Sequence, residues 1–168
     1  MAMFRCIGGS NKENMIEFNN IAFNGDDYYL FNPIKLFSRA FTNVDWEIIV
    51  NAETTQEDNS NHGILGIGVS GYSAIELMTT NTDGLFKFYN RNIGNTTGST
   101  ELGYLNNKDI KLTKRNGVLT ITSDGIELFN GNFSPTSSNK GLTFGAYEGN
   151  SWQYFIGNVN KFTYNILT

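Results

Sequence analysis

The residues best placed for chemistry are two carboxylates two positions apart, Asp45 and Glu47. In an extended strand such residues point to the same face, with Cα atoms about 6.5 to 7 Å apart. Hydrolysis of a glycosidic bond needs a carboxyl pair at close range. Carboxylates also keep a strand face hydrated. Catalysis by Asp45 and Glu47 is therefore one hypothesis, and a solvated strand face is the preferred one.

Nucleophilic catalysis of the Ser-His-Asp or Cys-His type needs a histidine, and the chain has one, His62. It lies in a polar loop from Glu53 to Gly63, without a nucleophile motif beside it. Together with Asp58, Asn59 and Asn61 it falls short of a zinc-binding pattern. We interpret His62 as a loop surface residue and expect the protein not to be an enzyme.

Several aromatic residues occur beside Gly, Asn or Ser, where their rings would meet the apolar face of a sugar. Trp152 lies in a polar stretch before the last strand, either as an exposed platform or as a lid folded onto the core. The predicted carbohydrate-binding residues are Trp152, Tyr147, Tyr72, Tyr104 and Asn150.

An acidic turn, Asp26 and Asp27, follows Asn24-Gly25. Calcium takes carboxylate, amide and backbone oxygens, so these two residues are the first candidates for a calcium site. Ordinary turn chemistry explains the same residues without an ion and is the preferred interpretation. No other cofactor is indicated.

The elements that must position these side chains are short strands. The 168 residues fit one domain, 39% are hydrophobic and 14% aromatic, and 18 Gly stand against two Pro. Such a composition is typical of a folded chain with many turns. Residues 1–15 are expected to be a tail or short strand, and residues 16–168 a β-sandwich domain. Residues 33–40 predict an irregular crossing or a single helical turn.

Strand patterns recur along the whole domain. The clearest spans residues 41–51, in which Val44, Trp46, Ile48 and Val50 alternate with polar residues and should face the core. The turn clusters 82–84 and 115–117 predict hairpins. The predicted strands cover residues 16–18, 21–23, 28–31, 41–51, 64–69, 74–79, 85–89, 102–104, 110–114, 118–122, 126–129, 142–146 and 155–167. This set predicts an all-β, two-sheet antiparallel jelly-roll sandwich.

The order of four segments resembles the concanavalin A-like lectin/glucanase superfamily with its laminin-G-like domains. These are the run from Ile21 to Tyr29, the strand from Phe41 to Ile48, the hairpin from Ile110 to a terminal Asp124-Gly125, and the closing strands from Leu142 to Tyr164. The resemblance implies a glycan-binding, glycosidase or interaction module. Small stand-alone versions resemble tail-associated proteins of bacteriophages. The Glu-x-Asp-x-x-Glu run of the family's glycosidases is absent.

Charge and composition exclude several partners. The formal net charge is −4, and the basic residues Lys108, Lys111, Lys114 and Arg115 gather around one strand. This group would meet an acidic glycan or guard a sheet edge, and it is too small a footprint for nucleic acid. The N-terminus has no secretory signal pattern. The sequence contains no run of about 18 apolar residues that could span a membrane. Cys6, the single cysteine, excludes an intrachain disulfide.

The prediction that follows is a non-catalytic carbohydrate-binding module, acting as a phage accessory protein that recognises a glycan of the host surface. If the chain comes from a phage, the expected location is the virion or an extracellular surface. Otherwise a soluble protein without a signal peptide is expected. Two alternatives stay open. One is a structural protein that forms homo-oligomers or assembles with a virion through the sandwich, and the other is a glycoside hydrolase using Asp45 and Glu47.

Overall fold

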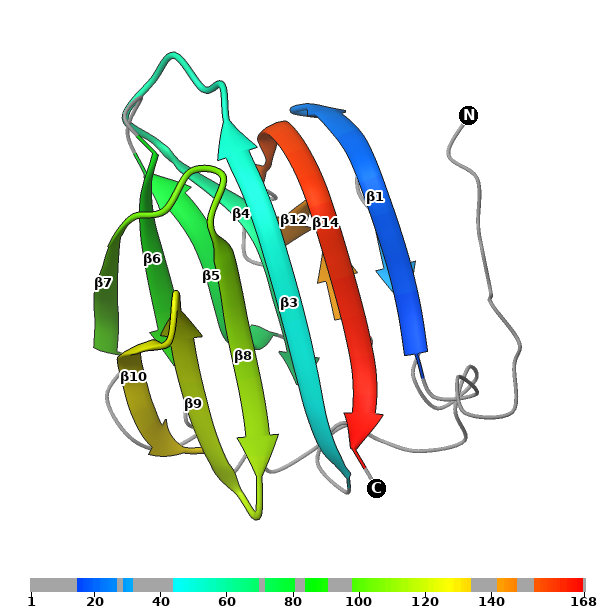
Figure 1. Ribbon diagram of the computed structural model, residues 1–168. Coiled ribbons are helices and arrows are strands. Elements are labelled where there is room, and N and C mark those ends of the chain that lie inside the picture. Colours follow the sequence, from blue (N-terminus) through cyan, green and yellow to red (C-terminus); the bar gives the residue numbers. More distant parts are fainter. Residues whose placement is uncertain are drawn as a thin grey trace.

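The computed structural model describes residues 15–26, 29–31, 44–69, 72–80, 84–90, 98–133, 142–147 and 153–167. In these ranges all regular elements are β-strands, and they form two layered sheets (Figure 1). The prediction of an all-β sandwich of two antiparallel sheets is confirmed. Within the same ranges there is no helix with the length and hydropathy to cross a bilayer.

Sheet A has six antiparallel strands, and it pairs strands from the two ends of the chain. Strand β14 (Ile156–Leu167) pairs with β3 (Asp45–Thr54) over most of its length, and β1 (Met15–Asn24) flanks β14 on the outside. On the other side of β3 follow β8 (Asp109–Arg115), β9 (Val118–Ser123) and the edge strand β10 (Ile126–Asn132). The termini of the domain are therefore joined within one sheet.

Sheet B lies against sheet A. Its antiparallel strands run in the order β7 (Gly98–Tyr104), β6 (Leu85–Asn90), β5 (Tyr72–Thr80) and β4 (Asn61–Val69), followed by β11 (Leu142–Phe144) and β2 (Tyr29–Phe31). The two-residue strands β12 (Ala146–Tyr147) and β13 (Gln153–Tyr154) extend the sheet beside β4. The β13–β4 contact is parallel and joins Tyr154 to Gly63.

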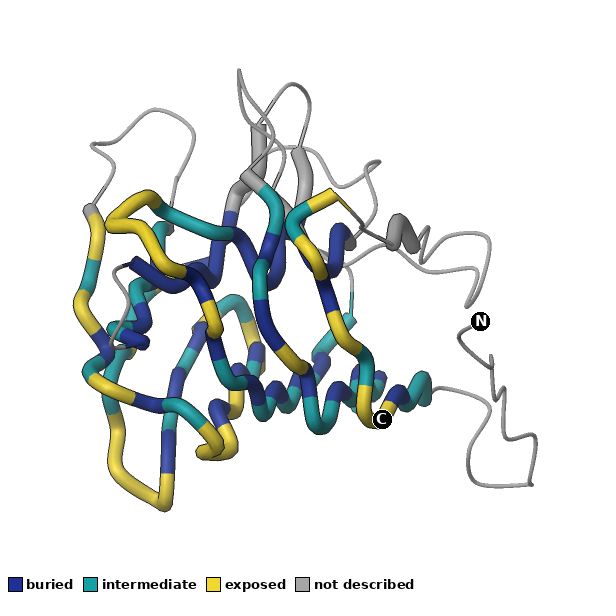
Figure 2. The backbone as a smooth tube through the Cα atoms, turned by 90° about the horizontal axis from the view of Figure 1, so that it is seen from above, coloured by how far each residue is buried: buried dark blue, intermediate teal, exposed yellow. Residues whose placement is uncertain are grey.

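The core between the sheets is built by alternate residues. In β3, Trp46, Ile48 and Val50 are fully buried, as the alternating pattern predicts. Val44, just before β3, is partly buried and packs against the core. Figure 2 shows the same alternation of buried and less buried positions along the strands. Aromatic rings join the layers, with the centroids of Phe144 and Phe162 4.5 Å apart. This interior is close-packed, so single core positions matter for stability.

Two tight turns place β8, β9 and β10 side by side. Asn116 and Gly117 have φ of 49° and 76°, and Asp124 and Gly125 have φ of 51° and 77°. Two consecutive positive φ angles are the mark of a type I′ turn, which matches the right-handed twist of a hairpin and favours Asn-Gly and Asp-Gly. The hairpin predicted at residues 115–117 is confirmed. The pairing of Thr80 with Leu85 likewise confirms the hairpin around residues 82–84.

Some predicted boundaries are wrong. The separate strands predicted at 16–18 and 21–23 are one strand, β1, because Asn20 takes a φ of 56° as a local irregularity and pairing with β14 resumes at Ile21. The loop predicted from Glu53 to Gly63 is shorter, since β3 reaches Thr54 and β4 begins at Asn61. Residues 1–14 and 32–43 lie outside the described residues, so the tail and the crossing at 33–40 stay predictions.

Candidate functional site

The two sheets differ in how far their outer faces are open. In β5 of sheet B every residue from Ile75 to Thr80 is buried, so both faces of that strand are covered. In β3, β8 and β9 of sheet A, buried residues alternate with partly or fully exposed ones. Across β3, β8 and β9 the outer face of sheet A is therefore accessible, and its exposed side chains are candidates for a binding site.

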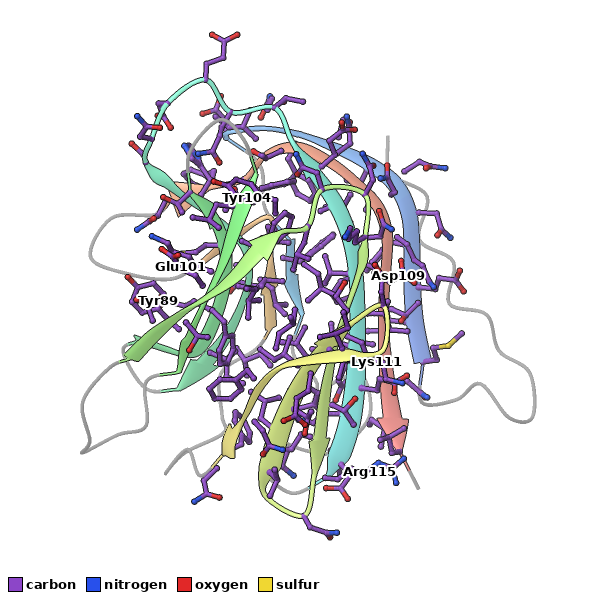
Figure 3. All side chains as sticks on the ribbon, turned by 60° about the vertical axis from the view of Figure 1, so that its left-hand side comes forward. Tyr89, Glu101, Tyr104, Asp109, Lys111 and Arg115 are labelled. Atoms are coloured by element: carbon purple, nitrogen blue, oxygen red, sulfur yellow. The ribbon has the colours of Figure 1, made fainter. Side chains whose placement is uncertain are left out.

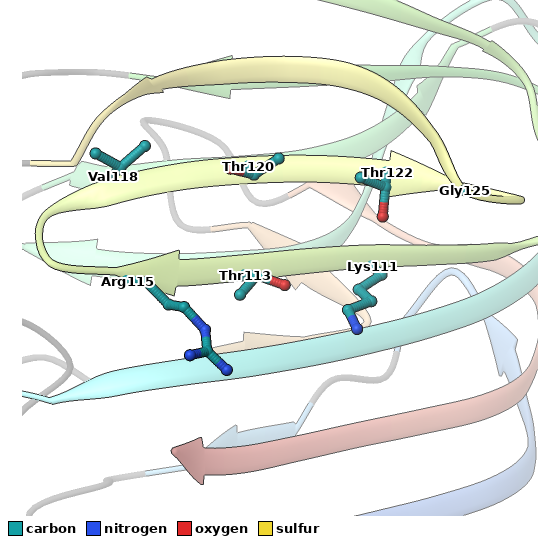
Figure 4. A pocket seen from close by; sticks show the side chains of 7 residues that line it. All are labelled: Lys111, Thr113, Arg115, Val118, Thr120, Thr122 and Gly125. Atoms are coloured by element: carbon teal, nitrogen blue, oxygen red, sulfur yellow. The ribbon is translucent and has the colours of Figure 1, made fainter. Parts of the chain in front are cut away.

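A groove of about 620 Å³ lies on this outer face, over β8 and β9. The lining residues come alternately from the two strands and from the turn that follows β9 (Figure 4): Lys111, Thr113, Arg115, Val118, Thr120, Thr122 and Gly125. Its size falls within the range of small-molecule sites in proteins. The groove is open to solvent, so it suits part of an extended ligand.

Strand register arranges the lining in three cross-strand rows. Lys111 lies opposite Thr122, Thr113 opposite Thr120, and Arg115 opposite Val118. Directly opposed side chains on one face are about 4.5 to 5.5 Å apart at Cβ, so each row acts as a unit. The groove thus has a hydroxyl-rich middle and two different ends, one with a lysine and one with an arginine and an exposed valine.

The carboxylates singled out in the sequence border the groove on β3. Glu47 Oε2 lies 2.7 Å from Lys111 Nζ. Asp45 Oδ1 accepts a hydrogen bond from the backbone N–H of Asn116 at 2.9 Å and lies 3.5 Å from Lys114 Nζ. Both carboxylates are thus partnered by cations from the neighbouring strand, an arrangement that holds β3 and β8 together.

The interpretation of the basic group as an edge guard is wrong. Strand β8, which carries Lys111, Lys114 and Arg115, lies between β3 and β9 and has no free edge. Lys114 is 4% exposed and its Nζ donates to the Val44 carbonyl at 2.7 Å. Lys111 and Arg115 point outward instead, and Figure 3 shows them on the surface. Pairing between segments about sixty residues apart decides this difference.

A network of amides continues the outer face beyond the lysine end of the groove. Asn51 Nδ2 donates to Asp109 Oδ1 at 2.9 Å, and Asn160 Nδ2 donates to Asn51 Oδ1 at 3.0 Å and to Asn107 Oδ1 at 2.8 Å. Lys161 Nζ lies 3.3 Å from Asp109 Oδ2. These side chains satisfy one another, so the network fixes β14, β3 and β8 relative to each other.

A second polar cluster surrounds His62 at the end of the sandwich. Its Nδ1 lies 2.6 Å from the Tyr154 carbonyl oxygen and its Nε2 lies 2.9 Å from Asp58 Oδ1. The buried Gln56 closes the loop between them, donating to the Asp58 and Ser60 carbonyls and accepting from Thr79 Oγ1 at 2.7 Å. His62 was expected to be a surface residue of the loop, but it is the second residue of β4 and its ring connects the loop to β13.

We expect the Asp58 carboxyl to titrate at higher pH when His62 is replaced by alanine. In the native chain the hydrogen bond from His62, followed by the Ser60 backbone N–H, lowers the pKa of Asp58 below its ordinary value of 3.8. A depressed pKa means that the contact stabilises the fold above about pH 3.8 and is lost as the pH falls further. Carbon-13 NMR titration of the carboxyl measures this shift.

The remote variant Val118→Ala is the control for this titration and should leave the Asp58 curve unchanged. Equal Asp58 curves for the native chain and His62→Ala would contradict the assigned contact.

Of the predicted carbohydrate-binding residues, Tyr104 is the one whose side chain the structure describes, and it is not part of the groove lining. Tyr104 ends β7 on sheet B, where its side chain is 60% exposed (Figure 3). Tyr72 begins β5 and Tyr147 ends β12, and their side chains lie outside the described residues. Trp152 and Asn150 lie wholly outside them. A glycan contact by any of the five stays a prediction.

The acidic turn shows ordinary turn chemistry at its first residue. The exposed Asp26 donates its backbone N–H to Asn24 Oδ1 at 3.0 Å, as in an Asx turn. Asp27 lies outside the described residues. Within the ranges that the structure covers, no three His, Cys, Asp or Glu side chains are grouped for a metal ion. Calcium at Asp26 and Asp27 stays a prediction.

The sequence analysis did not predict the threonine hydroxyls of the groove as binding groups. Thr113, Thr120 and Thr122 carry no motif, and threonine is common in any strand. The available signal was the predicted hairpin at residues 115–117, since in-register alternation across it places Thr113 opposite Thr120 on one face.

Comparison with protein-family models and with curated protein sequences gives no match. Solved structures do match. The CBM40 of the Ruminococcus gnavus IT-sialidase, also solved bound to α2,3-sialyllactose, superposes with a TM-score of 0.65 at 16% identity over 91% of this chain and 94% of its own. Mouse laminin α1 domains LG4-5 give 0.60 at 19% identity, over 90% of this chain and 43% of that one. The SAP-like pentraxin of Limulus polyphemus gives 0.58 at 9%, covering 93% and 78%.

The likeness is one of fold. At these identities the structures share the lectin-like jelly roll, which confirms the predicted concanavalin A-like architecture. The fold alone does not assign a function, because proteins of one fold carry out many activities and their function depends on the side chains of the site.

Proposed function

We propose that this protein is a non-catalytic carbohydrate-binding module whose ligand lies in the groove over β8 and β9. The observation that carries the proposal is the groove itself, an open trough with threonine hydroxyls along its middle and cations at both ends. Hydroxyls of Thr113, Thr120 and Thr122 both donate and accept hydrogen bonds, as sugar hydroxyls require. The exposed Val118 offers an apolar contact for a ring face or substituent.

The fold neighbours add support of a weaker kind. The R. gnavus module that shares the fold over nearly its whole length is a carbohydrate-binding module solved with sialyllactose. Its ligand is evidence about that module, and it makes an oligosaccharide the first ligand class to test on this chain. Binding without turnover agrees with the ion pairs that engage Glu47 and Asp45.

The experiment is a titration of the chain with a panel of neutral and acidic oligosaccharides, followed by calorimetry and by backbone amide shifts in NMR. We expect saturable binding, with the largest shifts in β8 and β9. Replacing Thr120 with tyrosine fills the middle of the groove while keeping a good strand former, so affinity should fall at least about tenfold.

The matched control is Thr163→Tyr, the same substitution on β14 of the same sheet face and outside the groove lining. It should bind as the native chain does. Equal loss in both variants, or no loss in Thr120→Tyr, would contradict the groove as the site. If no oligosaccharide of a broad panel binds, the proposed function is wrong.

A host-surface glycan, a phage particle and a virion or extracellular location belong to the same proposal. They rest on the resemblance in the sequence alone, and detection of the chain in purified particles is the test. Assembly into homo-oligomers likewise stays a prediction, to be tested by light scattering coupled to size exclusion.

A further inference from the structure

The charges around the groove are not balanced evenly. Its two ends carry one cation each, Lys111 at one and Arg115 at the other, and Figure 4 shows both side chains extending from β8 toward β3. Whether each cation is available to a ligand depends on the carboxylates that β3 offers it.

The lysine end is neutralised. Lys111 Nζ lies 2.7 Å from Glu47 Oε2, at a distance typical of a charge-assisted hydrogen bond. Glu47 is the less exposed partner, at 22% against 45% for Lys111. An anionic ligand at this end would have to compete with a carboxylate that is already in place.

At the arginine end, the nearest carboxylate on β3 is that of Asp45, and it already has other partners. Asp45 Oδ1 accepts the Asn116 backbone N–H at 2.9 Å and contacts Lys114 Nζ at 3.5 Å. Lys114 is buried, so its charge is compensated by Asp45 and the Val44 carbonyl rather than by solvent. Asp45 is therefore the carboxylate partner of Lys114.

Arg115 is left with an exposed guanidinium, and among the described residues no carboxylate lies within ion-pair distance of it. Of the three cations of β8, Lys111 and Lys114 thus each have a carboxylate of β3 as partner, and Arg115 has no carboxylate partner among the described residues. It lies beside the exposed Val118, which is 37% exposed, and one row away from the hydroxyls of Thr113 and Thr120.

We propose that the groove is specific for anionic saccharides, with the carboxylate or sulfate of the ligand bound by Arg115 and the sugar hydroxyls bound at Thr113 and Thr120. The inference rests on the proposed function and adds the ligand class and its direction in the groove. A guanidinium binds a planar carboxylate or a sulfate through two parallel hydrogen bonds, which a lysine does not reproduce.

A nucleic acid is a poor candidate for the same charge. The groove lining holds two cations. The described outer face of sheet A presents no aromatic ring for base stacking, because its aromatic residues are buried in the core or, in the case of Phe129, packed against it: Phe18, Phe23, Trp46, Phe129, Phe162 and Tyr164. The chain as a whole has a net charge of −4, which opposes association with a polyanion. A short acidic glycan brings one anionic group to one arginine.

The experiment compares matched ligands on folded variants checked by circular dichroism. The probes are lactose, 3′-sialyllactose and a 3′-sulfated lactose, which share a neutral part and differ in the anionic group. We expect the native chain to bind both acidic probes at least about tenfold more tightly than lactose. Arg115→Ala should reduce the acidic probes to the level of lactose, and Arg115→Lys should restore only part of the preference.

One variant and one condition serve as controls. Lys108→Ala removes an exposed cation that pairs with Asp124 outside the groove lining, and the preference for acidic probes should survive it. The preference should weaken between 20 and 500 mM salt because an exposed contact is screened, with a Debye length of roughly 10 Å at 0.1 M. Lys111→Ala removes the cation at the opposite end of the groove and tests the direction of the ligand.

The outcomes separate the two proposals. If lactose and the acidic probes bind the groove equally well, the anionic specificity is wrong and the proposed function stands. If the preference survives Arg115→Ala but is lost in Lys111→Ala, the direction of the ligand is wrong. If no probe and no glycan of the broader panel binds in the groove, the proposed function itself is overturned.

Discussion

Replacing Trp46 with alanine is expected to destabilise the protein by about 3 to 5 kcal/mol, a large share of the 5 to 15 kcal/mol that stabilises a typical domain. Trp46 is fully buried in β3, the strand that joins β14 to β8, and its ring meets Phe133 edge to face at 5.8 Å between centroids. Alanine leaves a cavity that neighbouring strands cannot close without losing their register. Urea unfolding followed by far-UV circular dichroism measures the change.

The melting temperature of Trp46→Ala should fall by roughly 10 °C for a chain of this size. Ile126→Ala is the control, because Ile126 is 65% exposed on β10 and its truncation should change stability by no more than about 0.5 kcal/mol. Equal urea midpoints for the two variants would contradict the placement of Trp46 in the core.

Replacing Gly157 with alanine is expected to be at least as damaging, through the backbone rather than through a cavity. Gly157 lies opposite Thr54 where β14 pairs with β3, at a φ of 149°. A Cβ atom there would overlap the Glu53 carbonyl oxygen and lie 2.9 Å from Thr54 Cα. Backbone atoms of a paired strand cannot turn aside, so the strands would have to separate at this point, at a cost of about 4 kcal/mol or more.

Gly103→Ala is the control that distinguishes the steric clash at Gly157 from the strain of a positive φ angle. Gly103 also has a positive φ, 104°, but a Cβ atom there would meet no atom within 4 Å. Its substitution should cost about 1 to 2 kcal/mol from strain alone. Chemical denaturation of both variants measures the difference, and equal losses would show that the close approach of β14 and β3 at Gly157 is not as described.

Both predictions bear on the groove through β3. Its outer residues Asp45 and Glu47 partner the cations of β8, while its inner residues hold the core. A variant that loosens β3 should therefore weaken ligand binding indirectly. Binding should be compared only among variants whose unfolding midpoints match that of the native chain.

The sequence predicted several separate parts of the candidate site. The alternation in residues 44–50 predicted which side chains of β3 are buried, and the Asn116-Gly117 turn predicted the hairpin that carries the groove. Local pattern suffices there because strand alternation has a period of two and an Asn-Gly turn fixes the register of its own hairpin. The sequence also placed Lys111 and Arg115 together as a basic group.

The sequence did not predict which cations of that basic group have carboxylate partners. Glu47 and Lys111 are 64 positions apart, and their contact exists only because β3 pairs with β8 in one register. A shift of one residue would turn Lys114 outward and Lys111 into the core. The tie between His62 and the Tyr154 carbonyl, across 92 positions, is of the same kind.

The amino-acid order by itself determined the class of the fold, the core stripe of β3 and the hairpin of β8 and β9, because propensity, alternation and turn geometry act over a few residues. Only the tertiary structure decided which strands are central and which charges are matched, leaving Arg115 as the cation without a carboxylate partner in the described chain. Such pairings are set by packing two sheets over one core, and no local pattern encodes them.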